Sequence, residues 1–246
     1  MQIYSVLQKG ESHPIFCEDF LYYEHLDQNR VVAAVMDGCS SGKDSHFPST
    51  LMGKVLQKIV QSLPNLPQSD PENDSDLLSV PGIGKHFAKS LFDDLARIYS
   101  YLLLDYTEFL STIILLVYDQ KTKDAWVLTS GDGYVSFNDE ITYLDQQNRP
   151  DYLTYHLHTG FEEWFEHNVR IFHENKIERI AISTDGIGSF FNYSRMSKKN
   201  RDPVRELLTS KIQGPDTLQH LIKSYKVDEG LLPYDDISII RVENAT

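Results

Sequence analysis

The stretch VVAAVMDGCSSGKDS, residues 31–45, predicts the centre of the fold. Its first six residues are apolar, which is typical of a buried strand. The run ends at Asp37-Gly38, and a loop of small residues then leads into a segment with helical periodicity that continues to about residue 63. A carboxylate at the end of a buried strand, with glycine beside it, is a suitable place to bind a metal ion or a phosphate group.

The bulk composition is that of a soluble globular protein. The 246 residues include 41% hydrophobic and 24% charged residues, and they are enough for one substantial domain. The chain carries 36 acidic and 23 basic residues, and its formal net charge of −13 argues against binding to nucleic acids or to anionic membrane surfaces. We therefore expect neither nucleic acid nor membrane among its partners.

Localisation and redox state follow from simple sequence features. The N-terminus has no secretory signal pattern, and no apolar run approaches the ~18 residues of a membrane span. The only cysteines, Cys17 and Cys39, form no CxxC pair, so a thiolate zinc site is not expected. These features favour a cytoplasmic protein with reduced thiols.

Hydrophobic periodicity predicts many strands and two long helices within one domain over residues 1–246. The helices are expected over about 44–63 and 83–103, with a proline-rich surface loop at about 62–82 between them. Residues 161–174 are compatible with helix or strand, and helical pieces should fill 187–226. The strands are expected over residues 2–8, 17–23, 31–36, 111–118, 124–129, 134–137, 140–144, 152–157, 177–183 and 235–242.

A hairpin between the second and third strands is predicted by the turn residues 27–30. If the hairpin register holds, Glu18 or Asp19 reaches the same end of the sheet as Asp37. Four apolar strands in fact carry acids at one end, in the pairs Glu18-Asp19, Asp37-Gly38, Asp185-Gly186 and Asp235-Asp236.

One such acid alone is most often a turn residue or a helix cap. Several carboxylates that converge repel one another, and they raise one another's pKa unless a cation lies among them. Oxygen ligands of this kind favour Mg²⁺ or Mn²⁺ over zinc, and the backbone carbonyl of Gly38 could be a further ligand.

Six short motifs, taken in their order along the chain, resemble those of the metal-dependent protein phosphatase family (protein phosphatase 2C-like, bacterial type). Each motif is weak alone, but together they span nearly the whole chain. The family's acid pair, DG, small-Thr, GDS, (S/T)DG and D(N/D)xS/T motifs correspond to Glu18-Asp19, Asp37-Gly38, Leu110-Ser111-Thr112, Gly131-Asp132-Gly133, Ser183-Thr184-Asp185-Gly186 and Asp235-Asp236-Ile237-Ser238. The resemblance implies an α+β fold, a four-layer α-β-β-α sandwich in which helices flank two antiparallel sheets.

The resemblance also implies metal ligands. Two Mn²⁺ or Mg²⁺ ions would lie at one end of the sandwich, and Asp37 would bridge them. Glu18 and the Gly38 carbonyl would bind one ion, and Asp185 and Asp235 would bind the other. Many bacterial members bind a third ion, which here would use Asp185 and Glu108, with Asp105 as a weaker candidate for the second ligand.

The implied reaction is hydrolysis of phosphoserine or phosphothreonine in a protein, the substrate being a target of a Ser/Thr kinase. A water that bridges two divalent cations loses a proton near neutral pH and can attack phosphorus in line. Asp37 and Asp185 would thus be catalytic through that water.

Some positions depart from the family pattern. The arginine that often precedes the acid pair is absent, and His13 and Pro14 occupy that region. His13 or Lys43 could therefore bind the phosphate group instead. The region over about 145–177 lacks the usual internal motif, which predicts an atypical flap.

Two other functions are compatible with parts of the sequence. The loop Ser40-Ser41-Gly42-Lys43-Asp44-Ser45 is similar to the SGGxDS loop of ATP pyrophosphatases, which binds pyrophosphate at a helix N-terminus. That fold alternates strand and helix, whereas the strands after residue 110 look antiparallel. The other alternative is a phosphatase-like binding module with weak or no catalysis, although such a module has no reason to keep four repelling acids.

Overall fold

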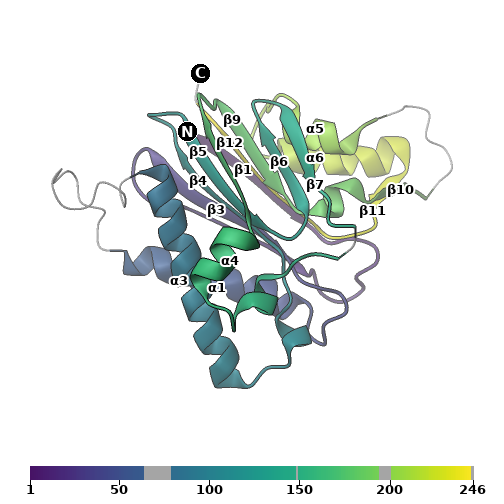
Figure 1. The fold of residues 1–246 in the computed structure, drawn as a ribbon. Helices are drawn as coiled ribbons and strands as arrows, with labels where there is room; N and C mark the ends of the chain where they lie inside the picture. Colours follow the sequence, from purple (N-terminus) through teal and green to yellow (C-terminus); the bar gives the residue numbers. More distant parts are fainter. Residues whose placement is uncertain (64–78, 148, 194–200, 245–246) are drawn as a thin grey trace.

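Two five-stranded antiparallel sheets form the centre of the structure (Figure 1). This computed structural model describes residues 1–63, 79–147, 149–193 and 201–244. The first sheet has the order β1-β12-β9-β6-β7, with bounds Gln2–Gln8, Ile237–Glu243, Arg179–Ser183, Gly133–Phe137 and Glu140–Leu144. The second has the order β2-β3-β4-β5-β8, with bounds Asp19–His25, Arg30–Asp37, Ile113–Asp119, Asp124–Ser130 and Arg170–Asn175. A separate short pair joins β10, Phe190–Asn192, to β11, Leu231–Pro233.

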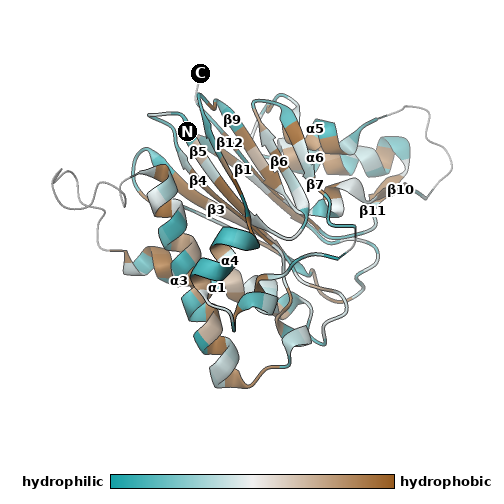
Figure 2. Cartoon of the chain, viewed as in Figure 1, coloured by the Kyte–Doolittle hydropathy of each residue, from teal (hydrophilic) through white to brown (hydrophobic). Residues whose placement is uncertain are grey.

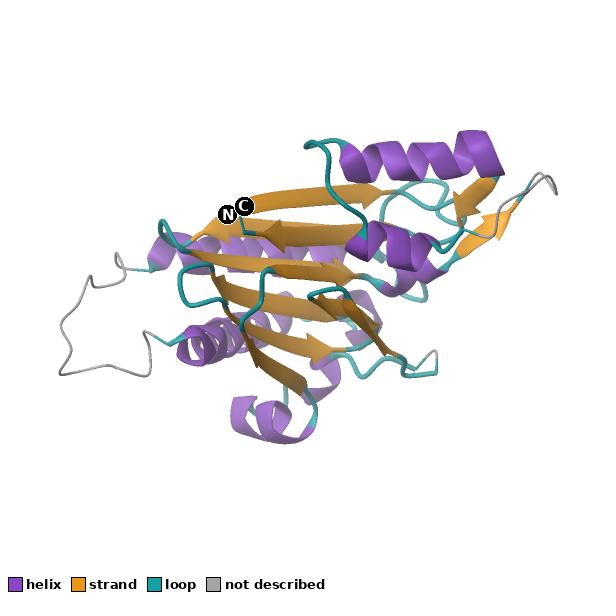
Figure 3. Ribbon diagram, turned by 90° about the horizontal axis from the view of Figure 1, so that it is seen from above, coloured by secondary structure: helices purple, strands orange, loops and turns teal. Residues whose placement is uncertain are grey.

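Helices cover the outer face of each sheet, so that four layers result (Figure 3). The second sheet packs against α1 (His46–Ser62), α3 (Val80–Leu102) and α4 (Phe161–His167). The first sheet packs against α5 (Pro203–Thr209) and α6 (Thr217–Ser224). A third apolar cluster lies between the sheets. The predicted α+β sandwich of two antiparallel sheets flanked by helices is confirmed.

Strand β3 shows why residues 31–36 are continuously apolar. Val32, Ala34 and Met36 pack towards the helices, whereas Val31, Ala33 and Val35 belong to the cluster between the sheets. Successive side chains of a strand point to opposite faces, and both faces of β3 are buried. Figure 2 shows the same distribution, with hydrophobic strands inside and hydrophilic outer surfaces on the helices.

Local signals explain the helix boundaries. The side chain of Ser79 caps α3 by accepting a hydrogen bond from the Gly82 N–H, and Pro81 occupies the first turn. The helix therefore begins three residues before the predicted residue 83. It ends where Leu103 adopts a left-handed conformation with φ of 54°. Most of the predicted surface loop over 62–82 lies outside the described residues.

Between β7 and β9 the sequence prediction was partly wrong. Residues 152–157 form no strand: the 3₁₀ helix η2 occupies Leu153–His156, where the Thr154 hydroxyl donates to the Phe109 carbonyl. The ambiguous segment 161–174 contains both structures, namely α4 and then β8. Phe161 and Trp164, three residues apart, are buried on one face of α4.

The segment 187–226 also differs from the expectation of helical pieces alone, because β10 lies within it and pairs with β11. The remaining short helices are η1 (Tyr106–Phe109) and η3 (Asp185–Gly188), and the π-helical turn η4 covers Tyr225–Glu229. In the described parts of the chain, no helix is both long and apolar enough to cross a membrane. The antiparallel sheets do not fit the ATP pyrophosphatase alternative, whose fold alternates strand and helix.

Candidate active site

The β2–β3 hairpin places two acids opposite each other. Asp19 is the register partner of Asp37 at the end of the hairpin. The start of β4 holds this end in place, because the Thr112 N–H donates to the Asp37 carbonyl at 2.8 Å and the Asp37 N–H donates to the Thr112 hydroxyl at 3.3 Å. The small-Thr motif thus serves to position Asp37.

The other sheet contributes acids from β9 and β12. Asp185 begins η3, two residues after the end of β9, and Asp235 lies two residues before β12. Thr184 connects the two sheets, since its hydroxyl donates to Asp19 Oδ2 at 2.7 Å and accepts from the Ser238 N–H at 3.0 Å. The Asp235 N–H donates to the Ser189 hydroxyl at 2.9 Å.

Two glycines are required for close backbone approach at these strand ends. A Cβ atom on Gly38 would lie 1.8 Å from the Ser45 carbonyl oxygen, and one on Gly186 would lie 1.7 Å from the Asp236 carbonyl oxygen. No other residue fits such a contact without displacing the backbone. Both DG motifs therefore have a steric reason that is independent of ion binding.

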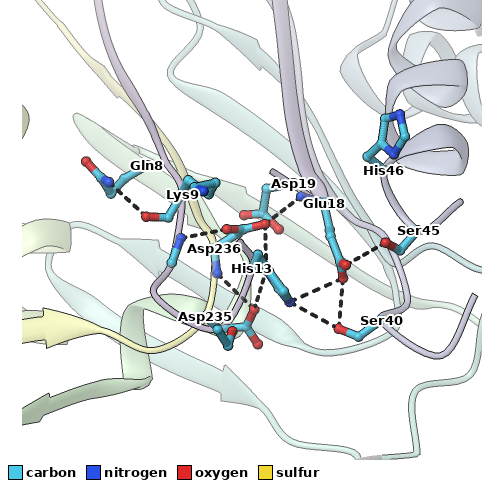
Figure 4. Close-up of polar contacts among 12 residues, drawn as sticks. Gln8, Lys9, His13, Glu18, Asp19, Ser40, Ser45, His46, Asp235 and Asp236 are labelled. Atoms are coloured by element: carbon cyan, nitrogen blue, oxygen red, sulfur yellow. Dashed lines mark hydrogen bonds and ion pairs between the residues drawn. The ribbon is translucent and has the colours of Figure 1, made fainter. Parts of the chain in front are cut away.

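Glu18 is oriented by hydroxyl groups from the loop after β3. Ser40 and Ser45 donate to its two carboxylate oxygens at 2.8 and 2.5 Å (Figure 4). His13 lies beside it, with Nε2 3.4 Å from Glu18 Oε2 and only 11% of the side chain exposed. Glu18 is therefore held in one orientation despite being an acid in a nearly buried position.

Asp236 organises the loop that carries His13 and Glu18. One carboxylate oxygen accepts from the Gly10 N–H at 2.6 Å, and the other accepts from the Glu18 N–H (Figure 4). The second oxygen also lies 2.8 Å from Nδ1 of His13, whose ring lies 3.6 Å from Asp235. Both ring nitrogens of His13 thus face carboxylates.

The acids influence one another electrostatically. Burial raises the pKa of Asp185 to about 7, and the charges of Asp132 and Asp235 add to the rise. Burial also raises the pKa of Asp37 well above its ordinary range, with further contributions from Asp19, Asp185 and Asp235. Burial also raises the pKa of Asp132, which lies between β5 and β6, and the charges of Asp145 and Asp235 add to the rise. Carboxylates from both sheets therefore gather at one end of the sandwich.

The chemistry of this region fits a hard cation. Oδ1 of Asp19 is buried without a hydrogen-bond partner, and burial raises the pKa of this carboxyl well above its ordinary value. An unpaired carboxylate oxygen among like charges is what a divalent cation would stabilise. Within the described residues, no three His, Cys, Asp or Glu side chains are arranged so that they could hold a metal ion together.

Glu108 and Lys43 lie beside this region and contact each other. The Glu108 carboxylate accepts from the Asp105 N–H in a capping box of η1, and Lys43 Nζ lies 4.0 Å from its other oxygen. Lys43 is 80% exposed. Asp105 accepts from the N–H and hydroxyl of Thr107 and is itself exposed.

Three acids that are buried in this region were given no separate role from the sequence: Asp19, Asp132 and Asp236. Asp132 is part of the Gly131-Asp132-Gly133 turn, in which both glycines have positive φ, and this motif could have directed attention to it. The contacts of Asp236 join residues more than 200 positions apart, and no local signal predicts them.

Comparison with known protein families identifies the family of the chain. The model of the protein phosphatase 2C family matches residues 9–221. The chain therefore belongs to the protein phosphatase 2C family. Members of this family are protein phosphatases that in general depend on Mg²⁺ or Mn²⁺. A search of curated proteins gives no match.

Solved structures show the same fold. A bacterial serine phosphatase is 14% identical, with 100% of each chain covered and a TM-score of 0.64. The serine/threonine phosphatase Stp1 from Staphylococcus aureus is 15% identical, with 100% of this chain and 95% of that chain covered and a TM-score of 0.63. RsbX, in a complex with magnesium, is 15% identical over 97% of this chain and 92% of that chain, with a TM-score of 0.53.

Proposed function

We propose that the chain is one catalytic domain over residues 1–246 that hydrolyses phosphoserine or phosphothreonine in proteins and depends on Mn²⁺ or Mg²⁺. The observation that carries this proposal is the gathering of carboxylates from both sheets, among which burial and mutual repulsion raise the pKa of Asp185 to about 7. Such a cluster opposes its own ionisation unless a cation is present. Family membership supports the same activity.

The proposed ligand assignment uses the strand-end acids. Asp37 would contribute to both ion sites, with Glu18 and the Gly38 carbonyl at one and Asp185 and Asp235 at the other. Bound divalent ions lower the pKa of a coordinated water and neutralise phosphoryl oxygens, which is the chemistry that the hydrolysis needs. Because no three of these side chains are arranged as common ligands, ion binding would require them to adjust.

Other residues of the chain would position these ligands. The hydroxyl groups of Ser40 and Ser45 orient Glu18, and the Thr184 hydroxyl fixes one oxygen of Asp19. Asp236 holds the backbone at Glu18. Each of these groups acts through an acid, so their proposed role is to position that acid.

A third ion near Asp185 remains part of the proposal. Glu108 is the ligand predicted from the sequence, but its carboxylate already accepts a hydrogen bond and lies beside Lys43. The electrostatic effect of Asp132 on Asp185 supports Asp132 as an alternative ligand.

Phosphate binding is proposed for Lys43, whose exposed ammonium group is available to an anion. The same role for His13 has less support, because both of its ring nitrogens face carboxylates. The proposed partner is a phosphoprotein that a Ser/Thr kinase modifies, and the proposed location is the cytoplasm.

The decisive experiment compares wild type with Asp37→Asn after removal of metals with EDTA. Turnover of para-nitrophenyl phosphate and of a phosphoserine peptide is measured with and without added Mn²⁺, and Mn²⁺ binding is measured by calorimetry. We expect turnover that requires Mn²⁺ and falls about 1,000-fold in Asp37→Asn. The substitution would weaken ion binding and thereby remove several kcal/mol of charge stabilisation from the transition state.

The matched control is Asp44→Asn, which changes an exposed acid seven positions further along the same loop. It should bind Mn²⁺ and turn over substrate like wild type. Absence of any metal-dependent turnover by wild type would favour the inactive binding module. Equal turnover by wild type and Asp37→Asn would contradict the proposed site.

A further inference from the structure

A cleft of about 410 Å³ lies beside the candidate active site. It is formed by the C-terminal half of α3, by η1 and by η2, and we call it the α3–η2 groove. Its lining includes Tyr99, Ser100, Tyr106, Thr154, Tyr155 and His158. Aromatic side chains thus dominate the groove, and within it only His158 belongs to a residue type that carries a positive charge.

The apolar surface of this region is exposed. Tyr106 and Tyr155 are 55% and 42% exposed, and Leu103, directly after α3, is 89% exposed. Figure 2 shows the corresponding hydrophobic colour at the free end of α3. Gathered apolar side chains that remain in water are typical of a surface that binds another molecule.

The short helix η1, which lines one side of the groove through Tyr106, also contacts the loop that follows Asp37. The Cys39 N–H, two residues after Asp37, donates to the Leu110 carbonyl at the end of η1. A Cβ atom on Gly42 would lie 2.6 Å from the Thr107 carbonyl oxygen, so the loop after Asp37 packs directly on η1.

A second connection passes through η2. Tyr152 contacts the Cys39 side chain, and its ring packs edge-on against Tyr155 at 5.6 Å between centroids. Tyr155 itself lines the groove. Both short helices that line the groove, η1 and η2, thus also contact the loop that follows Asp37.

The negative charge near the groove indicates which kind of peptide would bind there. Asp105 is exposed beside Tyr106, and hydrogen bonds from the Thr107 N–H and hydroxyl hold its pKa below the ordinary value, so it is ionised at neutral pH. The whole chain has a net charge of −13. A substrate segment with basic residues next to an apolar side chain would be attracted to this surface.

We infer that the α3–η2 groove is a docking site for the phosphoprotein substrate, in which an aromatic or long aliphatic side chain near the phosphorylated residue binds beside Tyr106 and Tyr155. This inference rests on the proposed phosphatase function. In this arrangement the anchoring side chain and the phosphoserine bind at separate places on the protein. The groove thereby selects substrates by a feature outside the phosphate itself.

The test uses metal-loaded full-length protein and phosphoserine peptides that differ only in the position of one phenylalanine. Ser100→Trp fills the groove from an exposed helix position, and Ser62→Trp, at the exposed end of α1, is the matched control. We expect one phenylalanine position to raise kcat/KM about tenfold through KM, which is the size expected when a partly exposed apolar side chain is buried.

Ser100→Trp should abolish this tenfold gain, whereas Ser62→Trp should keep it. Turnover of para-nitrophenyl phosphate, which is too small to reach the groove, should be unchanged in both variants. If para-nitrophenyl phosphate is turned over but no phenylalanine position matters, the docking site is refuted and the phosphatase function stands.

If no substrate is turned over, the phosphatase function fails, and docking is then measured separately by fluorescence anisotropy of the labelled peptides in EDTA. Binding that depends on phenylalanine and is lost in Ser100→Trp supports the groove even then, and absence of such binding refutes it. Sedimentation velocity tests whether a second copy of the chain occupies the groove instead. A wild-type dimer that Ser100→Trp converts to a monomer would show such an occupant and would contradict the inference.

Discussion

Asp19 and Asp37 are directly opposed partners in the register of the β2–β3 hairpin. Opposed residues on one face of a hairpin are close neighbours, and two like charges there destabilise the pair. Burial raises the pKa of both carboxyl groups, and Thr184 satisfies only one oxygen of Asp19. The pair therefore requires a proton or a cation, and several measurable properties depend on which is present.

The stability of the metal-free protein should fall as the pH rises from about 4 to 7. Burial raises the pKa of Asp185 to about 7, so the folded state binds this proton more tightly than the unfolded chain does. The resulting stabilisation of the folded state is fully present below the unfolded-state pKa near 3.8. The unfolded chain loses the proton first as pH rises, and the contribution is lost by the time the pH has passed the folded-state pKa. At about 1.4 kcal/mol per pH unit, the loss is at most about 4 kcal/mol.

Urea unfolding in EDTA at pH 5 and pH 8 measures this effect, with Asp185→Asn as the comparison. The variant should lose less stability than wild type between the two pH values, because its amide does not ionise. Mg²⁺ should restore wild type at pH 8 and have little effect on the variant. An identical pH dependence in both proteins would show that the Asp185 carboxyl is not destabilised in the folded state.

Asp236→Ala should destabilise the protein by about 2–5 kcal/mol. The change leaves the N–H groups of Gly10 and Glu18 buried without an acceptor and removes the carboxylate beside His13. Urea unfolding gives the free energy, and calorimetry should show weaker Mn²⁺ binding because Glu18 is no longer held. Ser12→Ala, which removes an exposed hydrogen bond from the same loop, is the control. A cost below about 0.5 kcal/mol for Asp236→Ala would contradict its role.

Gly186→Ala should cost at least about 3 kcal/mol or prevent folding. The added Cβ would lie 1.7 Å from the Asp236 carbonyl oxygen, so the backbone of one segment must move. Gly214→Ala is the matched control, since no atom lies within 4 Å of its added Cβ. Thermal unfolding of both variants measures the difference. Equal melting temperatures would mean that η3 and the segment before β12 are not packed as closely as described.

Lys43→Ala should leave the stability within about 0.5 kcal/mol of wild type, because its ion pair with Glu108 is exposed. If Lys43 binds the phosphate group, KM for a phosphopeptide rises several-fold while kcat changes little. Glu108→Gln releases Lys43 without removing it, and it should not raise KM. A KM for Lys43→Ala equal to that of wild type would exclude this residue from phosphate binding.

Most of the sandwich can be predicted from the sequence because burial on one or both faces leaves a clear pattern. Residues 31–36 are apolar throughout since β3 lies between two apolar layers. The segment 152–157 carries no comparable signal. Its conformation depends on tertiary contacts, such as the hydrogen bond from Thr154 to Phe109, 45 positions away, and local periodicity cannot reveal them.

The candidate site, too, is predictable from the sequence only where the signal is local. The two DG motifs are visible because close backbone approach admits only glycine at Gly38 and Gly186. The partners that surround the acids are not visible, because Thr184 and Asp19 lie 165 positions apart and Asp236 and Gly10 lie 226 apart. The sequence therefore predicts which acids stand at strand ends, and the roles proposed for them as metal ligands stay predictions.

Strands β1 and β12 are neighbours in the first sheet, with Gln2 opposite Glu243. Asp236, just before β12, can accept from the Gly10 and Glu18 N–H groups, and Asp235 can lie beside His13, only when these distant segments have met. Contacts of such sequence separation form slowly, because a long loop must close before any of them is made. During refolding we therefore expect Asp235 and Asp236 to join the acids of the β2–β3 hairpin only at the final closure of the first sheet, after most of the other strands can pair. Regain of ion binding would then follow the slowest phase.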